Sequence, residues 1–248
     1  MNRYLINRLS PFILSIVMLT SGIFIAGCSS NSAPSGDATV TTSSEMDQTT
    51  VKSRAMDKGQ PVIQTKGSRC DSIQITRARI LISNLKMHHD DGDTAGKGTI
   101  KIGPFLAEFN GSAGAKIIST VSVPAGTYDR IKLEFHKLSN ALDATLIADP
   151  IFAEFATSSR NTVIVEGKSY KNGTMTPFTY RSSLTDNLQV KFDPAITLEG
   201  GQNYNIGIKF DPFVLFAVGA NGPLDPTDVD NQKDIEAQIK LAIKAYKK

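Results

Sequence analysis

Apolar and polar residues alternate with a period of two along much of the chain. Ile131, Leu133 and Phe135 alternate with the charged or polar residues of the segment 130–136. Because successive side chains of a β-strand point to opposite faces, this alternation predicts a half-buried strand over 128–136. Similar apolar stretches predict further strands over 73–82, 98–109, 116–123, 162–171, 174–181, 188–192 and 204–210.

Turn residues separate the predicted strands. Asn172-Gly173 lies between two of them and suits a type I′ hairpin turn, which needs positive φ at both central residues. The segment Pro124-Ala125-Gly126-Thr127 is a second turn. About eight strands without helical patterns between them predict a mainly β fold. We expect an antiparallel β-sandwich of the Greek-key kind, similar to immunoglobulin or prealbumin domains.

The end of the chain has a different period. Helical spacing relates the apolar residues Ile235, Ile239, Ala242, Ile243 and Tyr246, and several lysines follow near the end of the chain. Acidic residues, Asp228, Asp230 and Asp234, lie near the start of this segment, so the charges suit a helix dipole. The pattern predicts a C-terminal amphipathic helix. We expect the helix to cover an open face or edge of the sandwich, and a partner-binding helix is the alternative.

The N-terminal segment has the organisation of a secretory signal. Arg3 and Arg8 precede an apolar stretch over 12–26, which ends in Ile25-Ala26-Gly27-Cys28. This order resembles a bacterial lipoprotein cleavage box, which implies cleavage after Gly27, lipidation of Cys28 and attachment to a membrane through acyl chains. An ordinary signal peptide with an incidental cysteine is the alternative. Ser29 in place of Asp favours the outer membrane, by resemblance to Gram-negative sorting rules.

These patterns divide the chain into four regions. We predict a lipoprotein signal peptide over 1–27 and, over 28–67, a lipidated Cys28 followed by a flexible tether rich in Ser and Thr. The β-sandwich domain follows over 68–222, with an acidic loop and the C-terminal helix over 223–248. A first strand around Val62-Ile63 is the alternative to a tether at that point.

Charge and cysteine content narrow the classes of partner. The formal net charge of +3 falls further when Arg3 and Arg8 leave with the signal, so no bulk basic field favours nucleic acid or an anionic membrane surface. The only two cysteines are Cys28 and Cys70, and lipidation of the first leaves no pair for an intramolecular disulfide. We expect Cys70 to be buried and inert, and a spare reactive thiol is the alternative.

One motif carries a resemblance to a known family. Ile102-Gly103-Pro104-Phe105 and the segment 123–133, which contains Pro124-Ala125-Gly126-Thr127-Tyr128, resemble the core of a widespread family of bacterial lipoproteins of unknown function. The resemblance runs over about 75–209. It implies a β-sandwich and a lipoprotein, and it implies no activity and no catalytic residues.

Two clusters contain residues that could bind a metal ion. His88 and His89 precede Asp90, Asp91 and Asp93, but neighbouring side chains of an extended chain point apart, so a solvated loop is our interpretation.

The second cluster, before the final helix, comprises Asp225, Asp228, Asp230 and Asn231. Calcium would suit these oxygen ligands, whereas helix capping explains the same residues without a metal ion.

Catalytic and carbohydrate-binding patterns are weak. The sequence lacks the nucleophile-elbow, phosphate-loop and zinc-protease motifs, and Ser83-Asn84-Leu85-Lys86 lacks the companion motifs of penicillin-recognising enzymes. His136 falls on the polar side of its predicted strand. Without Trp, a sugar platform would depend on Tyr170, Tyr180 and Tyr204. We therefore predict a non-catalytic, lipid-anchored envelope protein. It would either have a structural role or bind a partner, such as a protein, a carbohydrate or another ligand. A calcium- or metal-dependent solute-binding lipoprotein is the alternative.

Overall fold

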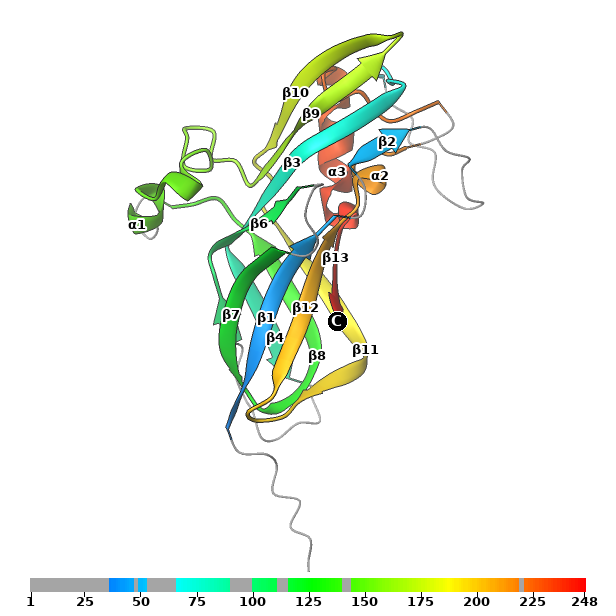
Figure 1. The fold of residues 1–248 in the computed structure, drawn as a ribbon. Coiled ribbons are helices and arrows are strands. Elements are labelled where there is room, and N and C mark those ends of the chain that lie inside the picture. The colour runs from blue at the N-terminus through cyan, green and yellow to red at the C-terminus, as the bar shows by residue number, and fades with distance from the viewer. Residues whose placement is uncertain are drawn as a thin grey trace, which may run out of the picture. The chain divides into compact units, whose positions relative to one another are not determined.

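The computed structural model describes residues 36–46, 49–52, 66–89, 100–110, 116–139, 144–218 and 221–248. These residues belong to one compact unit, Ala33–Lys248. The predicted mainly β fold is confirmed: the described residues form three mostly antiparallel sheets and a C-terminal helix (Figure 1). The signal segment and Cys28 lie outside the described residues.

The first sheet contains the strand nearest the N-terminus. This strand, β1 (Asp37–Glu45), runs parallel to one neighbour, with Thr39 opposite Asn203, and antiparallel to the other, with Thr39 opposite Ser122. The order of its strands is β13 (Ile243–Lys247), β12 (Asn203–Phe210), β1 (Asp37–Glu45) and β7 (Lys116–Pro124).

The second sheet includes the predicted Asn-Gly hairpin. Tyr180 lies opposite Val165 in this hairpin, as its spacing predicts. The order of its strands is β10 (Thr174–Ser182), β9 (Val163–Lys171), β3 (Ser72–Ile82) and β2 (Thr50–Lys52), and β6 (Phe105–Phe109) also pairs with β3.

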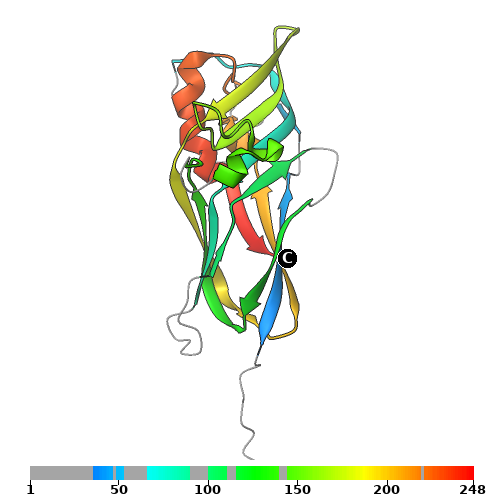
Figure 2. The same cartoon turned by 90° about the vertical axis from the view of Figure 1, so that its left-hand side faces the viewer.

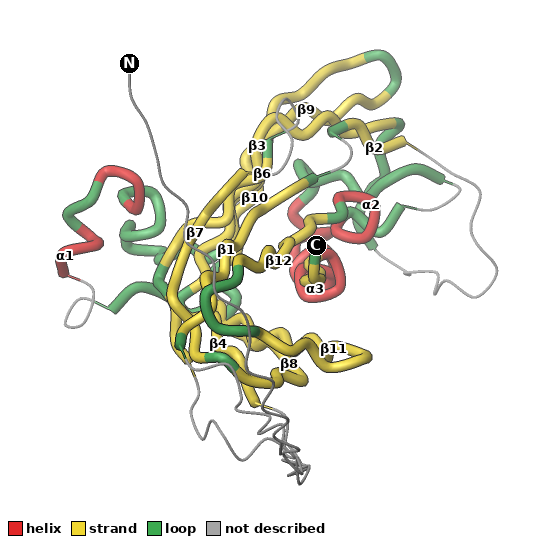
Figure 3. Tube along the Cα trace, turned by 60° about the horizontal axis from the view of Figure 1, so that its bottom comes forward, coloured by secondary structure: helices red, strands yellow, loops and turns green. Residues whose placement is uncertain are grey.

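The third sheet contains the most regular alternating strand. The order of its strands is β11 (Asp186–Leu198), β8 (Gly126–Phe135), β4 (Asn84–His89) and β5 (Ile100–Ile102). Ile131 and Leu133 of β8 are fully buried, whereas Lys132 between them lies on the outer face. Figures 1 and 3 show β8 and β4 facing β1 and β12 of the first sheet, and buried residues from all three sheets form the main hydrophobic core.

The C-terminal helix packs against the second sheet, as we expected. Ile235, Ile239 and Ala242 of α3 (Gln232–Ala242) are buried in the main core. The Tyr180 hydroxyl of β10 donates a hydrogen bond to the Gln232 carbonyl (3.4 Å). Short helical segments accompany α3, namely α2 (Pro212–Leu215) and η2 (Val229–Asn231).

A second, smaller core lies on the outer face of the second sheet. Phe152 and Phe155 pack there with Leu81 of β3 and Ile164 of β9. The segment that supplies the two aromatic rings includes α1 (Ala144–Ile147) and η1 (Pro150–Phe152) and is visible in Figure 2. This segment therefore covers part of the outer face of the sheet.

The prediction of a tether over 28–67 is wrong for the residues that form β1 and β2. Ala38, Val40 and Thr42 of β1 are fully buried, and β1 pairs on both edges. The run of Ser and Thr lacks apolar alternation, but backbone pairing on both sides and hydrogen bonds such as Ser44 Oγ to the Glu108 carbonyl (2.6 Å) stabilise it as a strand. Val62-Ile63 lies outside the described residues.

Three predicted element boundaries differ from the structure. The C-terminal helix was predicted to include Ile243 and Tyr246, but in the structure it ends at Ala242. Ile243 and Tyr246 lie in β13, which pairs with β12. The predicted strand 98–109 is divided because Pro104 has no N–H group and Gly103 has φ +127°, where an added Cβ would lie 3.0 Å from the Ser83 carbonyl oxygen.

The third boundary concerns the two histidines. His88 and His89 lie in β4 rather than in a solvated loop.

Candidate functional site

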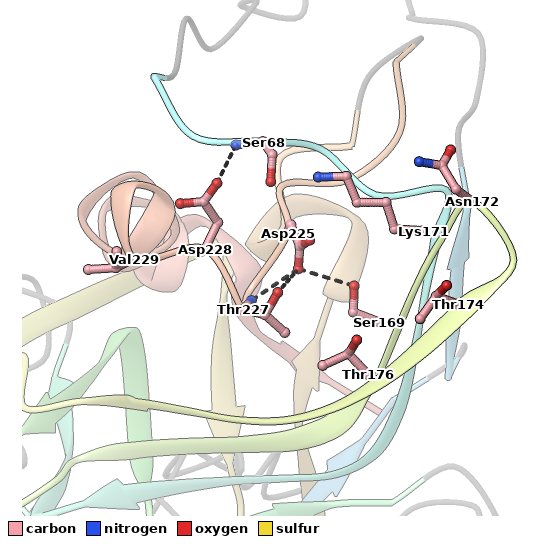
Figure 4. Close-up of a pocket in the computed structure, with 10 residues that line it drawn as sticks. All are labelled: Ser68, Ser169, Lys171, Asn172, Thr174, Thr176, Asp225, Thr227, Asp228 and Val229. Carbon is pink, nitrogen blue, oxygen red and sulfur yellow. Dashed lines mark hydrogen bonds between the residues drawn. The ribbon is translucent and has the colours of Figure 1, made fainter.

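A polar cleft of about 570 Å³ lies between the β9–β10 hairpin and the loop that leads to η2. Figure 4 shows Lys171, Thr174 and Thr176 on the hairpin side, opposite Asp225 and Asp228 on the loop side. The residues that line the cleft are Ser68, Ser169, Lys171, Asn172, Thr174, Thr176, Asp225, Thr227, Asp228 and Val229.

Asp225 forms the buried wall of the cleft, with an exposed fraction of 5%. Its Oδ1 accepts hydrogen bonds from Ser169 Oγ (3.1 Å), Thr227 N (3.0 Å) and Thr227 Oγ1 (2.7 Å). One oxygen of this carboxylate therefore accepts three hydrogen bonds. The two from Thr227 stabilise the turn that contains Asp225, and the one from Ser169 connects this turn to β9.

Asp228 caps the helical turn that follows. Its Oδ1 accepts a hydrogen bond from Asp230 N (3.0 Å), and its Oδ2 accepts one from Ser68 N (2.7 Å). These hydrogen bonds, led by the one from Ser68, lower the pKa of Asp228, and the positive charge of Lys171 lowers it further. The helix-capping interpretation of the acidic cluster is confirmed for Asp228.

Asn231 connects the same loop to the chain before β3. Its Nδ2 donates hydrogen bonds to the carbonyls of Ser68 (2.6 Å) and Asp225 (3.0 Å), and the residue is fully buried. A Cβ at Gly67 would lie 2.3 Å from Asn231 Oδ1, so only glycine allows this close approach. The loop side of the cleft is therefore fixed by contacts between residues distant in sequence.

The hairpin side of the cleft has exposed polar groups. Lys171, Asn172, Thr174 and Thr176 are all exposed to solvent. Thr176 lies opposite Ser169 in the register of β9 and β10, which puts both hydroxyls on the same face. An ammonium group, an amide and two hydroxyls can thus donate hydrogen bonds to a molecule in the cleft.

The predicted metal ligands are dispersed. Within the part of the chain that the structure describes, no group of three His, Cys, Asp or Glu residues could hold a metal ion. His88 lies on the outer face of β4 opposite Arg130, and burial followed by the charge of Arg130 lowers its pKa. The ring of His89 stacks on Tyr128 instead, with centroids 4.2 Å apart.

Asp230 is exposed, and its backbone N–H donates to Asp228. Asp90, Asp91 and Asp93 lie outside the described residues.

The remaining candidates have structural surroundings. Cys70 is buried, as expected, and burial raises the pKa of its thiol to about 11. The Tyr170 hydroxyl donates to Gln74 Oε1 (3.3 Å), and Tyr180 packs in the core. Tyr204 belongs to a different sheet from these two tyrosines, so the three do not form one platform. His136 follows β8 and is half-buried.

The polar hairpin residues of the cleft were not anticipated as part of a site, namely Ser169, Lys171, Asn172, Thr174 and Thr176. Their hydroxyl and amine groups alternate with other residues along two ordinary strands, a pattern shared by any exposed strand face. The Asn-Gly turn predicts their hairpin, but only the tertiary fold brings it beside the loop 225–229.

Comparisons with protein-family models, with curated proteins and with solved structures find no match for this chain. The resemblance to an uncharacterised lipoprotein family therefore stays a prediction. Among the described residues, no helix is long and apolar enough to cross a membrane.

Proposed function

We propose that this chain is a lipid-anchored bacterial envelope protein whose β domain binds a small polar solute without catalysis. The cleft at the β9–β10 hairpin carries this proposal. Lys171, Thr174 and Thr176 offer donors from one side, and the buried Asp225 wall is already fixed by three hydrogen bonds. A preformed concave site with a few polar groups suits ligand binding.

The architecture that we propose for this domain is an antiparallel β-sandwich with Greek-key connections. The main hydrophobic core shared by the three sheets supports it, and so does the packing of first-sheet against third-sheet strands. The ring contact between Phe109 of β6 and Phe210 of β12 joins the second sheet to the same core (centroids 5.4 Å apart).

The anchor is supported by the Ile25-Ala26-Gly27-Cys28 box. We expect radiolabelled palmitate to be incorporated by the wild-type chain and by Cys70→Ser, but not by Cys28→Ser, because only Cys28 follows the cleavage box. Both substitutions remove one cysteine, so they are matched. Label that persists in Cys28→Ser would exclude lipidation at this position.

The cleft is tested with a panel of sugars, sugar acids and amino acids. We expect at least one class to raise the melting temperature of the purified protein. Thr176→Val and Lys171→Met should abolish the rise, whereas Thr179→Val, an exposed threonine of the same strand outside the cleft, should retain it. A ligand-induced rise that survives both cleft substitutions would place binding elsewhere and overturn this site.

The calcium-dependent alternative makes a different prediction. Three of the four carboxylate oxygens of Asp225 and Asp228 already accept hydrogen bonds from N–H and O–H donors, with which a cation would compete. We therefore propose that the solute binds directly, and we expect millimolar calcium to leave the melting temperature unchanged. A rise that Asp225→Asn abolishes would favour the calcium-dependent protein instead.

A further inference from the structure

Cationic side chains are aligned across the outer face of the third sheet. Lys86 of β4 lies directly opposite Lys101 of β5 on one side and Lys132 of β8 on the other. In the next row, Arg130 of β8 lies opposite Lys191 of β11. Directly opposite residues of antiparallel strands share a face of the sheet, so the five cations form one surface, which we call the basic face.

Acidic groups of the described residues form ion pairs with only some of the cations of the basic face. Glu134 forms ion pairs with Lys86 and with Lys132 (3.0 Å), and Asp129 pairs with Arg130 (2.6 Å). Lys101 and Lys191, at the two edges of the sheet, are exposed. Among the described residues, these five cations outnumber the two paired acids and Asp193, which is exposed two residues beyond Lys191 on β11, although the formal charge of the whole chain is only +3.

The surroundings of His88 report the same excess. His88 lies on this face opposite Arg130. Burial is the largest cause of its lowered pKa, and the charges of Arg130, Lys132 and Lys86 lower the pKa further, whereas Asp129 raises it. Like charges directly opposite one another destabilise a sheet, so an external anion on this face would relieve repulsion that the acids of the described residues neutralise only in part.

The basic face lies within reach of the proposed anchor. The Ala125 N–H, just before β8, donates a hydrogen bond to the Gly36 carbonyl (3.1 Å), so the chain joins the domain at the end where β8 begins. A fully extended chain from Cys28 to Gly36 spans at most about 30 Å. Arg130 and Lys132 lie about 14 and 20 Å along the strand from Gly126.

We propose that the basic face docks on the phosphate headgroups of an anionic bilayer, the one to which Cys28 attaches the chain. The inference rests on the lipid anchor of the proposed function. A bilayer surface presents many phosphates in one plane, which matches cations spread over four adjacent strands. Because the anchor already holds the domain near the headgroups, a small excess of charge is enough to orient it.

The test is lysine acylation of the full-length protein reconstituted in vesicles, read by mass spectrometry. We expect Lys101, Lys132 and Lys191 to be protected in vesicles of phosphatidylcholine with phosphatidylglycerol, but not in phosphatidylcholine alone. High salt should remove the protection. Lys168 of β9, which lies on the second sheet, is the internal control and should react equally in both vesicles.

A charge-neutralised variant sharpens the test. Lys101→Gln with Lys191→Gln should lower the docked population about fivefold for each charge removed, seen as renewed reactivity of Lys132 in anionic vesicles. Lys52→Gln with Lys168→Gln removes two lysines from the second sheet outside the cleft and should leave the protection of Lys132 intact. Equal reactivity in both vesicles, or protection of Lys132 that survives the first double substitution, would overturn the proposal.

Two further outcomes separate this inference from the anchor. A protein that does not float with neutral vesicles but binds anionic vesicles through the same lysines would refute the anchor and support the docking face. Protection by inorganic phosphate in neutral vesicles, with none from the anionic lipid, would assign the face to a free anion and overturn the bilayer as its occupant.

Discussion

The outer faces of the second and third sheets differ in how far acidic residues neutralise their cationic side chains. On the second sheet, Arg79 is 4% exposed and pairs with both Glu154 and Glu166, while Arg77 pairs with Glu108 (3.1 Å). The small core around Phe155 covers part of this face. On the third sheet, two of the described acids, Glu134 and Asp129, form ion pairs with three of the five cations, and the edge lysines are exposed.

The arginines on the outer face of the second sheet are neutralised by acids of the same protein, whereas the edge lysines of the third sheet are exposed to solvent. Arg77 and Arg79 of the second sheet have acidic partners in the same chain, and an aromatic ring lies beside Arg79, whose guanidinium is 5.8 Å from the Phe155 centroid. Contacts there contribute to stability. The surplus on the third sheet contributes little to folding, so we expect its substitutions to affect binding more than stability.

The largest expected effect comes from uncovering the second sheet. Phe155→Ala should lower the free energy of unfolding by about 3 to 4 kcal/mol, because the ring is fully buried in the small core and its loss leaves a cavity. Urea denaturation of the purified protein measures this change. Ile151→Ala removes an exposed side chain nearby and should cost less than about 0.5 kcal/mol. Equal costs for the two variants would show that this segment does not cover the sheet.

The next effect concerns the one buried acid of the basic face. Glu134→Gln should cost on the order of 2 to 3 kcal/mol at neutral pH, because Lys86 and Lys132 then face each other without their shared partner. The exposed Glu199→Gln is the matched control and should change little. An unchanged free energy of unfolding in Glu134→Gln would mean that hydration of the two lysines replaces their ion pairs with Glu134 at no cost.

Stability should also depend on pH through Glu134. Burial alone would raise the pKa of this carboxyl, but hydrogen bonds and charges from Lys86 and Lys132 outweigh burial and lower it to about 2, from 4.5. Its stabilisation is complete above the unfolded pKa and is lost as the pH falls toward 2. Between about pH 6 and pH 3 this residue should account for a loss of about 2 kcal/mol. The loss is measured as the difference in slope between wild type and Glu134→Gln, and parallel slopes would contradict it.

The smallest effect on stability should come from the edge of the basic face. Lys191→Gln should change the free energy of unfolding by less than about 0.5 kcal/mol, with a slight gain because Arg130 lies directly opposite. Urea denaturation at low and high salt measures it, and the gain should vanish at high salt. A loss of more than about 1 kcal/mol would show that Lys191 has a stabilising role within the fold.

Regular alternation predicted the strands whose inward positions are apolar. β8 and β12 follow the pattern closely, and the Asn-Gly pair gave the β9–β10 hairpin. β1 was missed because polar Thr42 and Ser44 occupy its buried side and are tolerated through long-range pairing. Ile243 and Tyr246 fit helical spacing as well as a strand, and pairing with β12 decided between the two.

The candidate sites depended on tertiary contacts to a greater extent. Capping by Asp228 was accessible from the sequence because Asp suits a helix start, but its second partner, Ser68, lies far away along the chain. The charged side of β8 was visible, whereas the alignment of Lys101, Lys86 and Lys132 required the register of three strands. Local patterns do not encode either juxtaposition.

The position of β1 has a consequence for the order of events during export. In a chain that crosses a membrane from its N-terminus, as the proposed signal implies, β1 would emerge first. In its parallel pairing with β12, Thr39 lies opposite Asn203. β1 could therefore form this pairing only after most of the chain had crossed the membrane. Contacts between residues so distant in sequence form slowly. We therefore expect the emerging segment to depend on periplasmic holding factors, and acylation at Cys28 to precede completion of the first sheet.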